Sequence, residues 1–240
     1  MSLFETTELA CPSCGTHVLF EMVHSVNADR RPDLRAAILN GTFQLETCPS
    51  CGKAFRTDPK FTYLNLAKDE WIAVYPDPEA ARWRELEEEV QALYDESFGA
   101  GAPAAARALA KDVRPRLVFG WGALCEKLRA QEDGLDDVEL ELLKIGLLRN
   151  LETKHYSLEM ETELRFVSAV PAPEDAGEEA EDTLSFAWME GGTSEVLEAL
   201  SVPRSLYEEI RADNRLWAKL RYELSQGIFV DMERLVTIGA

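Results

Sequence analysis

The hydrophobic pattern of residues 1–76 is typical of β-structure interrupted by one helix. Residues 17–26 are rich in β-branched and aromatic side chains, which favour strands. Shorter runs of the same kind predict three more strands, at 43–47, 61–66 and 71–75. Pro32 fits the first turn of a helix that the Asn40-Gly41 pair would end. We therefore predict a β-rich module that contains one short helix.

From residue 77 onwards the apolar positions follow a helical period. Trp83, Leu86, Val90 and Leu93 mark one face of a predicted helix, and glutamates occupy its other side. The small residues from Gly99 to Pro103 would end this helix.

Two further helices are predicted between residues 117 and 151. Their apolar faces are Leu117, Trp121, Leu124 and Leu128 in the first helix, and Leu140, Leu143, Leu147 and Leu151 in the second. Gly134 would stop the first, and Asp136 with Glu139 has the spacing of a capping box for the second. Because the connection is short, the two helices are predicted to form a helical hairpin.

The last ninety residues mix strand and helix signals. Strands are predicted at 157–170, 184–189 and 228–236, and a helix at 203–224 with a break near Asn214. Residues 171–182 hold six acidic side chains among Pro, Ala and Gly, which predicts a solvated loop.

Charge separates the two parts of this pattern. The chain has 240 residues and a formal net charge of −19. Residues 1–76 hold 7 Lys and Arg against 9 Asp and Glu, whereas residues 77–240 hold 18 against 35. An acidic surface repels phosphate backbones and anionic membranes, so it argues against both as partners. It suits a well-solvated, soluble surface first, and a basic protein partner as the alternative.

The chain shows no feature of secretion or membrane insertion. Met1 to Glu5 lacks the basic and apolar regions of a signal peptide, and the longest apolar run, Leu117 to Cys125, is too short to span a bilayer. We expect a cytoplasmic protein, in which paired cysteines more often bind metal than form disulfides.

The clearest chemical signal is a repeated five-residue motif. Cys-Pro-Ser-Cys-Gly stands at 11–15 and again at 48–52. Two residues between cysteines allow a tight knuckle whose backbone N–H groups point at sulfur, and the glycine permits the positive φ needed to leave it. Two facing knuckles supply four thiolates in tetrahedral geometry. Cys11, Cys14, Cys48 and Cys51 are therefore the predicted ligands of one structural Zn²⁺.

Other readings of the cysteines stay open. A rubredoxin-like iron site uses similar knuckles and transfers electrons, and some zinc ribbons bind nucleic acid. Six basic residues near the motifs would contact the phosphates of a nucleic acid: Arg30, Arg31, Arg35, Lys53, Arg56 and Lys60. His17 could contact a ligand sulfur, while Cys125 fits a buried apolar position.

The paired cysteine motifs resemble those of the bacterial CpXC domain family. Residues 32–41, before the second motif, are similar to the family's linking helix, and segments within 118–144 are similar to its later helical part. The resemblance covers about residues 8–150 and implies a zinc-ribbon-like module followed by helices, with no implied activity. The overall layout is also similar to a myxobacterial cell-polarity protein with this domain, which implies action with a roadblock-type GTPase-activating protein on a Ras-like GTPase.

These observations predict an α+β protein in three parts. A β-rich zinc-ribbon-like module would span 1–76, a helical part of the CpXC-like domain 77–150, and an acidic α+β region 151–240. No phosphate-binding loop or nucleophile elbow is present, so no catalytic residue and no organic cofactor is predicted. We expect a non-enzymatic adaptor or regulator that acts through protein contacts.

Overall fold

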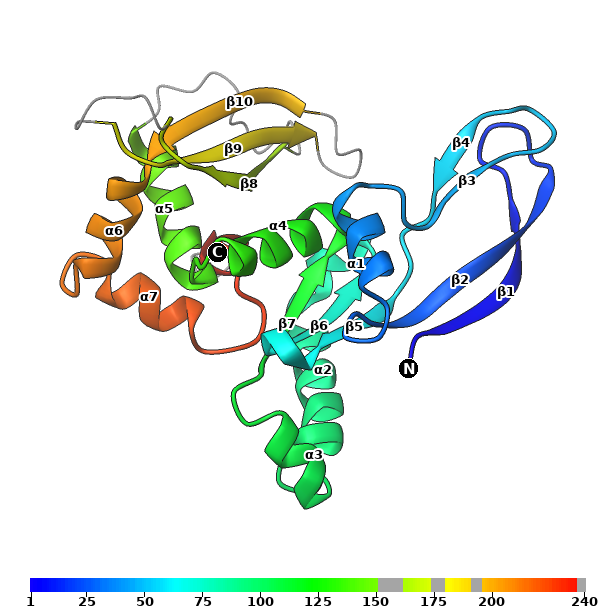
Figure 1. Ribbon diagram of the computed structural model, residues 1–240, viewed down its shortest axis with the longest axis horizontal. Helices are drawn as coiled ribbons and strands as arrows, with labels where there is room; N and C mark the ends of the chain where they lie inside the picture. Colours follow the sequence, from blue (N-terminus) through cyan, green and yellow to red (C-terminus); the bar gives the residue numbers. More distant parts are fainter. Residues whose placement is uncertain (151–161, 174–179, 191–195, 237–240) are drawn as a thin grey trace. The chain divides into compact units, whose positions relative to one another are not determined.

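A computed structural model describes residues 1–150, 162–173, 180–190 and 196–236 (Figure 1). The chain divides into two compact units, Met1–Leu124 and Cys125–Ala240. The division falls inside helix α4 (Gly120–Glu132). The predicted boundaries after residues 76 and 150 stay predictions.

A five-stranded mixed sheet forms the centre of the first unit. Its order is β1-β2-β5-β6-β7, with bounds Leu3–Ala10, His17–Asn27, Phe61–Asn65, Glu70–Tyr75 and Arg114–Phe119. β1 with β2 and β5 with β6 pair antiparallel, whereas β2 with β5 and β6 with β7 pair parallel. A separate hairpin joins β3 (Leu45–Thr47) to β4 (Ala54–Arg56). The strand-rich first region is confirmed.

The helices of the first unit bury apolar side chains, and α2 buries three of the four positions of its predicted apolar face. Helix α1 (Pro32–Leu39) buries Leu34 and Ile38. Helix α2 (Trp83–Phe98) buries Trp83, Leu86 and Val90, but Leu93 is exposed. Helix α3 (Ala104–Leu109) and two short 3₁₀ helices, η1 (Leu66–Lys68) and η2 (Asp77–Arg82), complete the connections.

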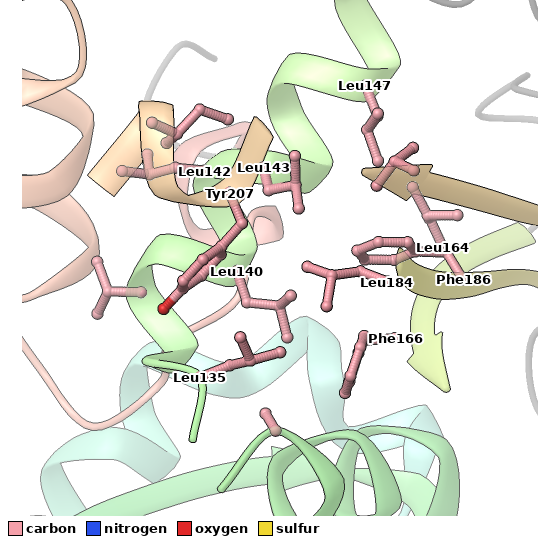
Figure 2. Packing of buried hydrophobic residues seen from close by; sticks show 14 of the residues in the cluster. Leu135, Leu140, Leu142, Leu143, Leu147, Leu164, Phe166, Leu184, Phe186 and Tyr207 are labelled. Carbon is pink, nitrogen blue, oxygen red and sulfur yellow. The ribbon is translucent and has the colours of Figure 1, made fainter. Parts of the chain in front are cut away.

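The second unit packs helices against an antiparallel sheet of order β10-β9-β8. The strands are β8 (Thr162–Val170), β9 (Thr183–Glu190) and β10 (Val196–Pro203), and the helices are α5 (Asp137–Asn150), α6 (Arg204–Ala212), α7 (Ala218–Leu224) and α8 (Glu233–Val236). Its core joins leucines of α5 to Leu164, Phe166 and Phe186 of the sheet and to Tyr207 of α6. Figure 2 shows these side chains pointing toward one another. An α+β fold is confirmed.

Only the Asp136 half of the predicted capping box is present at the start of α5, because the Asp136 N–H donates to the Tyr207 hydroxyl and the Glu139 carboxylate pairs with Arg221. The Asp136 carboxylate accepts hydrogen bonds from the backbone N–H groups of Val138 and Glu139, at 3.0 and 3.3 Å. Gly134 has φ +68°, which ends the preceding helix. The predicted break in the 203–224 helix is also present, because α6 ends at Ala212 and α7 begins at Ala218.

Two predicted elements are wrong. Leu117 belongs to strand β7 and not to a helix, because the buried run Leu117 to Phe119 pairs with β6 and the helix begins only at Gly120. Residues 228–236 do not form a strand. Phe229 and Val230 are buried in an irregular segment, and α8 begins where the Asp231 carboxylate accepts a hydrogen bond from the Glu233 N–H, at 2.9 Å.

Some predictions fall partly outside the described residues. The predicted strand at 157–170 is present from Thr162, and residues 157–161 lie outside the description. Of the predicted acidic loop, the described residues 171–173 and 180–182 have no regular structure, and 174–179 lie outside. Leu151 and His155 are outside as well.

Candidate metal centre

The first cysteine motif forms the turn between β1 and β2. The Cys11 carbonyl accepts a hydrogen bond from the Gly15 N–H, and the Cys11 N–H donates to the Thr16 carbonyl, both at 2.8 Å. Gly15 leaves the turn at φ +74°, a conformation that glycine adopts without strain. The turn is thus held by its own backbone.

The second motif repeats this geometry between β3 and β4. The Gly52 N–H donates to the Cys48 carbonyl and the Cys48 N–H donates to the Lys53 carbonyl, both at 2.9 Å. Gly52 has φ +71°. The two knuckles are therefore equivalent in backbone hydrogen bonding, as their identical sequences predict.

The knuckles face each other and bring the four predicted ligands together. The Sγ atoms of Cys11 and Cys51 lie 3.8 Å apart, and those of Cys14 and Cys48 lie 3.6 Å apart. All four ligand atoms lie within 4.8 Å of one another. A tetrahedral ion with metal–sulfur bonds of about 2.3 Å needs sulfurs about 3.8 Å apart, so the cluster has the size of a metal cage.

Burial within the cage is uneven. Cys11 and Cys48, the first cysteine of each knuckle, are 2% and 0% exposed. Cys14 and Cys51 are exposed. One side of the cluster thus faces the protein and the other faces solvent, which leaves the metal a route of entry.

Proton affinities differ sharply between neighbouring thiols. Hydrogen bonding with Thr16 lowers the pKa of Cys14 to about 6. A hydrogen bond from the Lys53 backbone lowers the pKa of Cys51, but desolvation and the other thiols outweigh it and raise this pKa to about 11. Four thiolates this close repel one another, so full ionisation requires a cation between them.

Within the described residues these four cysteines are the one group with metal-ligand spacing. His17 lies beside Glu8, with Nδ1 3.5 Å from the carboxylate, and His24 Nε2 lies 3.1 Å from Glu5. Cys125, a partly buried thiol of the second unit, lies outside this group.

At least three of the six basic residues near the motifs contact other side chains of the protein. Arg35 is buried and donates to the hydroxyl of Tyr63 at 2.7 Å and to the carboxylate of Glu70 at 3.1 Å. Arg31 pairs with Asp33 at 2.6 Å. The guanidinium of Arg56 lies 4.0 Å from the ring centre of Trp121. Arg35 and Arg56 thus pack within the fold, which leaves fewer cations for a phosphate-binding patch.

Comparison with known proteins decides the family. The sequence model of the family described as CpXC protein matches residues 9–144, which include both cysteine motifs. The chain belongs to the CpXC family. Curated proteins and solved structures gave no match. Among the residues described, no helix combines the length and apolar character that crossing a bilayer requires.

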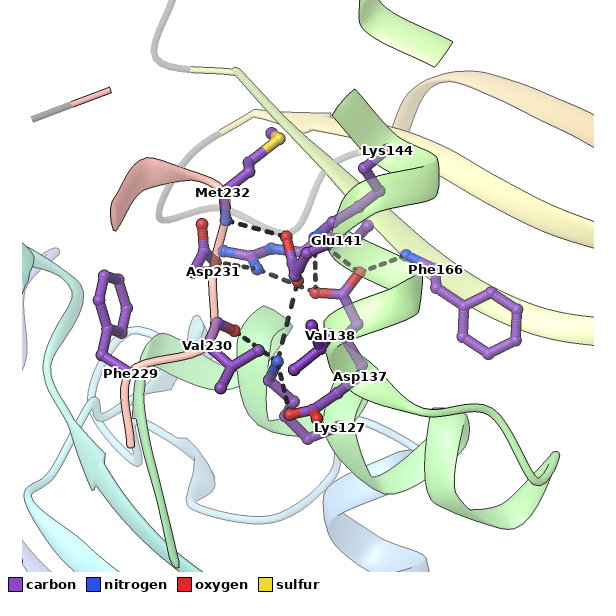
Figure 3. A network of polar contacts seen from close by, with 12 residues as sticks. Lys127, Asp137, Val138, Glu141, Lys144, Phe166, Phe229, Val230, Asp231 and Met232 are labelled. Atoms are coloured by element: carbon purple, nitrogen blue, oxygen red, sulfur yellow. Dashed lines mark hydrogen bonds and ion pairs between the residues drawn. The ribbon is translucent and has the colours of Figure 1, made fainter. Parts of the chain in front are cut away.

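Sequence reasoning missed a buried charge network in the second unit (Figure 3). Lys144 Nζ lies 3.1 Å from Glu126 and 2.8 Å from Glu141, and all three side chains are 1% exposed. Arg165 pairs with Glu126 at 3.0 Å and with Asp231 at 3.2 Å. A signal was available, because Glu141 and Lys144 are flanked by the apolar positions of α5 at helical spacing.

Proposed function

We propose that this CpXC protein is a non-enzymatic adaptor or regulator whose first unit is cross-linked by zinc. The observation that supports the proposal is the convergence of four thiols from two equivalent knuckles. Because Cys11, Cys14, Cys48 and Cys51 would fill all four positions of a tetrahedral ion, no position is open for a substrate. Such an ion stabilises structure and does not activate water.

Zinc would join two turns that are distant in sequence. Between Cys14 and Cys48 lie 33 residues, and the two knuckles belong to different hairpins, β1–β2 and β3–β4. Structural zinc contributes apparent binding free energies of about 10–16 kcal/mol in zinc-finger peptides. That exceeds the net stability of most small domains. The ion would therefore fix the orientation of β3–β4, which has only three residues in each strand.

The acidic remainder of the chain suits contact with a basic protein surface. Residues 77–240 contain 35 Asp and Glu against 18 Lys and Arg. Helix α2 exposes several of these groups, among them Glu85, Glu88 and Glu89. Interfaces rich in complementary charge gain mainly in association rate and in partner selectivity.

The partner we propose is a Ras-like GTPase acting with a roadblock-type GTPase-activating protein. The basis is the similarity of layout to a myxobacterial polarity protein. A protein without catalytic residues can still accelerate hydrolysis, because orienting the switch loops places the attacking water.

The proposal is tested by single-turnover GTP hydrolysis with a purified Ras-like GTPase and a purified roadblock-type GTPase-activating protein. Adding the zinc-loaded full chain should raise the hydrolysis rate at least about tenfold, an effect of about 1.4 kcal/mol on the barrier. The Cys48→Ser variant should give no stimulation, whereas Cys125→Ser should act as the parent does. An unchanged rate together with no co-purification of either protein would remove the GTPase role.

A further inference from the structure

The solvent-facing half of the four-cysteine cluster is open to small reagents. Cys14 and Cys51 are exposed, and so are the Pro and Ser residues that separate the cysteines within each knuckle. A Cβ added at Gly15 or Gly52 would meet no atom of the described chain within 4 Å beyond its immediate neighbours. A molecule of few atoms can therefore reach two of the four sulfurs without any movement of the backbone.

Each exposed thiol contacts a buried thiol of the opposite knuckle. Cys14 Sγ lies 3.6 Å from Cys48 Sγ, and Cys51 Sγ lies 3.8 Å from Cys11 Sγ. Cys48 and Cys11 are only 0% and 2% exposed. The cluster thus consists of two pairs, and in each pair a reagent from solvent reaches one sulfur and not the other.

This arrangement suits thiols that are oxidised in two steps. A cysteine is oxidised to a sulfenic acid more readily the more it is exposed and the more it is present as thiolate, and a neighbouring thiol then condenses with the sulfenic acid to form a disulfide. Cys14 and Cys51 are exposed, and cysteines that bind a metal ion are deprotonated. Cys125 is only partly exposed and lies outside the cluster.

We propose that the cluster is a modification site for hydrogen peroxide, at which each exposed thiol is oxidised and then forms a disulfide with the buried thiol that it contacts. The inference rests on the zinc-loaded first unit proposed above. The exposed thiolate attacks one peroxide oxygen, the O–O bond breaks and hydroxide leaves, which gives the sulfenic acid. The buried sulfur then attacks the sulfenic sulfur, and the S–O bond breaks as water leaves. Each disulfide thus takes two electrons from two thiolates, consumes one peroxide and two protons, and yields two waters.

The disulfides would replace the metal ion as the link between the two hairpins. Because only the thiolate is a metal ligand, the oxidised cluster would not retain zinc. The bridges Cys14–Cys48 and Cys11–Cys51 each join β1–β2 to β3–β4, so the hairpins would stay connected. Bridges within the knuckles would leave the hairpins unlinked, and the connectivity of the disulfides therefore distinguishes the two outcomes.

The test uses the zinc-loaded full chain, with its zinc content measured before hydrogen peroxide is added. A chromogenic zinc chelator should detect one zinc ion released for every two peroxides consumed, and dithiothreitol with added zinc should restore the loaded chain. Peptide mapping by mass spectrometry without reduction should find the Cys14–Cys48 and Cys11–Cys51 disulfides. Cys125→Ser should release zinc at the rate of the parent chain.

The order of reaction identifies the thiols that peroxide reaches first. Dimedone, which traps sulfenic acids, should label Cys14 and Cys51 at least about tenfold more than the two buried cysteines or Cys125 when peroxide is limiting. Faster labelling of a buried cysteine, or disulfides within the knuckles, would overturn the inference. So would a loaded chain that retains its zinc at about a hundredfold excess of peroxide, and this result would leave the proposed function intact. A chain that cannot be loaded with zinc would overturn both proposals.

Discussion

Replacing Lys144 by methionine should destabilise the second unit severely. The side chain is 1% exposed and holds two buried carboxylates, Glu126 and Glu141. Burial alone would lower the pKa of Lys144, but these carboxylates raise it instead, so the residue stays charged. Methionine has similar volume and leaves no large cavity, so the loss would be electrostatic.

The expected loss of unfolding free energy depends on which partners each carboxylate retains once Lys144 is removed. Glu126 retains Arg165 at 3.0 Å and the Phe166 N–H at 2.7 Å. Glu141 retains the Met232 N–H at 3.0 Å and only a distant Lys127 at 3.8 Å. Removing one partner of a buried pair costs about 3–5 kcal/mol, and Glu141 should account for most of it.

Urea unfolding followed by circular dichroism measures this loss. With a slope of about 2 kcal/mol per molar, the midpoint of the second unit should fall by about 2 M. Hydrogen exchange of the β8 peptide assigns the change to this unit. Lys219→Met, at an exposed lysine of α7, should cost less than about 0.5 kcal/mol.

A second substitution separates charge from packing. In Lys144→Met, Glu141 is the carboxylate left with the fewest partners. Adding Glu141→Gln removes its charge and should recover about 1–2 kcal/mol of the unfolding free energy. The reasoning would be refuted if Lys144→Met lost no more unfolding free energy than Lys219→Met. It would also be refuted if the double variant, with Glu141→Gln, were less stable than Lys144→Met alone.

Two further predictions concern the first unit and the glycines. Burial raises the pKa of Glu70 to about 7, although Arg35 opposes this, so the folded state binds a proton more tightly than the unfolded chain and stability falls as pH rises toward 7. Between pH 6 and 8, Glu70→Gln should reduce this loss of unfolding free energy by about 1–2 kcal/mol in urea titrations. The control Glu89→Gln, at an exposed position, should show the same loss as the parent. If the pH dependence of stability were equal in Glu70→Gln and the parent, Glu70 would not be its source. Gly120→Ala should cost more than about 2 kcal/mol in thermal unfolding, because φ is +70° and the new Cβ would lie 2.2 Å from Asp77 Oδ1. Gly146→Ala should instead leave the free energy of unfolding unchanged or raise it by up to about 1 kcal/mol, because its Cβ would lie at an ordinary 3.5 Å from Trp217. If Gly146→Ala destabilised the protein more than Gly120→Ala, the helix boundaries given above would be contradicted.

The four-cysteine cluster could be found from sequence because its information is local. Each knuckle is made by five consecutive residues, and the glycines at 15 and 52 adopt the positive φ that the motif requires. The faces of α2 and α5 were likewise visible, since periodicity reports burial directly. The motif predicts two facing knuckles, and the structure adds the sulfur–sulfur distances and the unequal burial of the four cysteines.

The elements that were missed or wrong depend on distant parts of the chain. The run 117–125 is apolar throughout, which suits a buried strand or a helix equally until pairing with β6 selects the strand. Strand β10 exposes Val196 and Leu197 at the sheet edge, so its burial does not alternate. The charge network joins Glu126 to Lys144 across 18 residues and Arg165 to Asp231 across 66. The apolar spacing around Glu141 and Lys144 could have indicated that these two side chains are buried, but no single-sequence pattern identifies their partners.

Elemental analysis of the purified full chain tests the central claim most directly. The cage predicts one zinc per chain by inductively coupled plasma mass spectrometry, its loss in Cys48→Ser, and its retention in Cys125→Ser, the cysteine outside the cage. Iron in place of zinc, with the red colour of a four-thiolate ferric site, would assign an electron-transfer centre instead. A chain without metal whose thermal unfolding is the same in Cys48→Ser and in the parent would contradict the account.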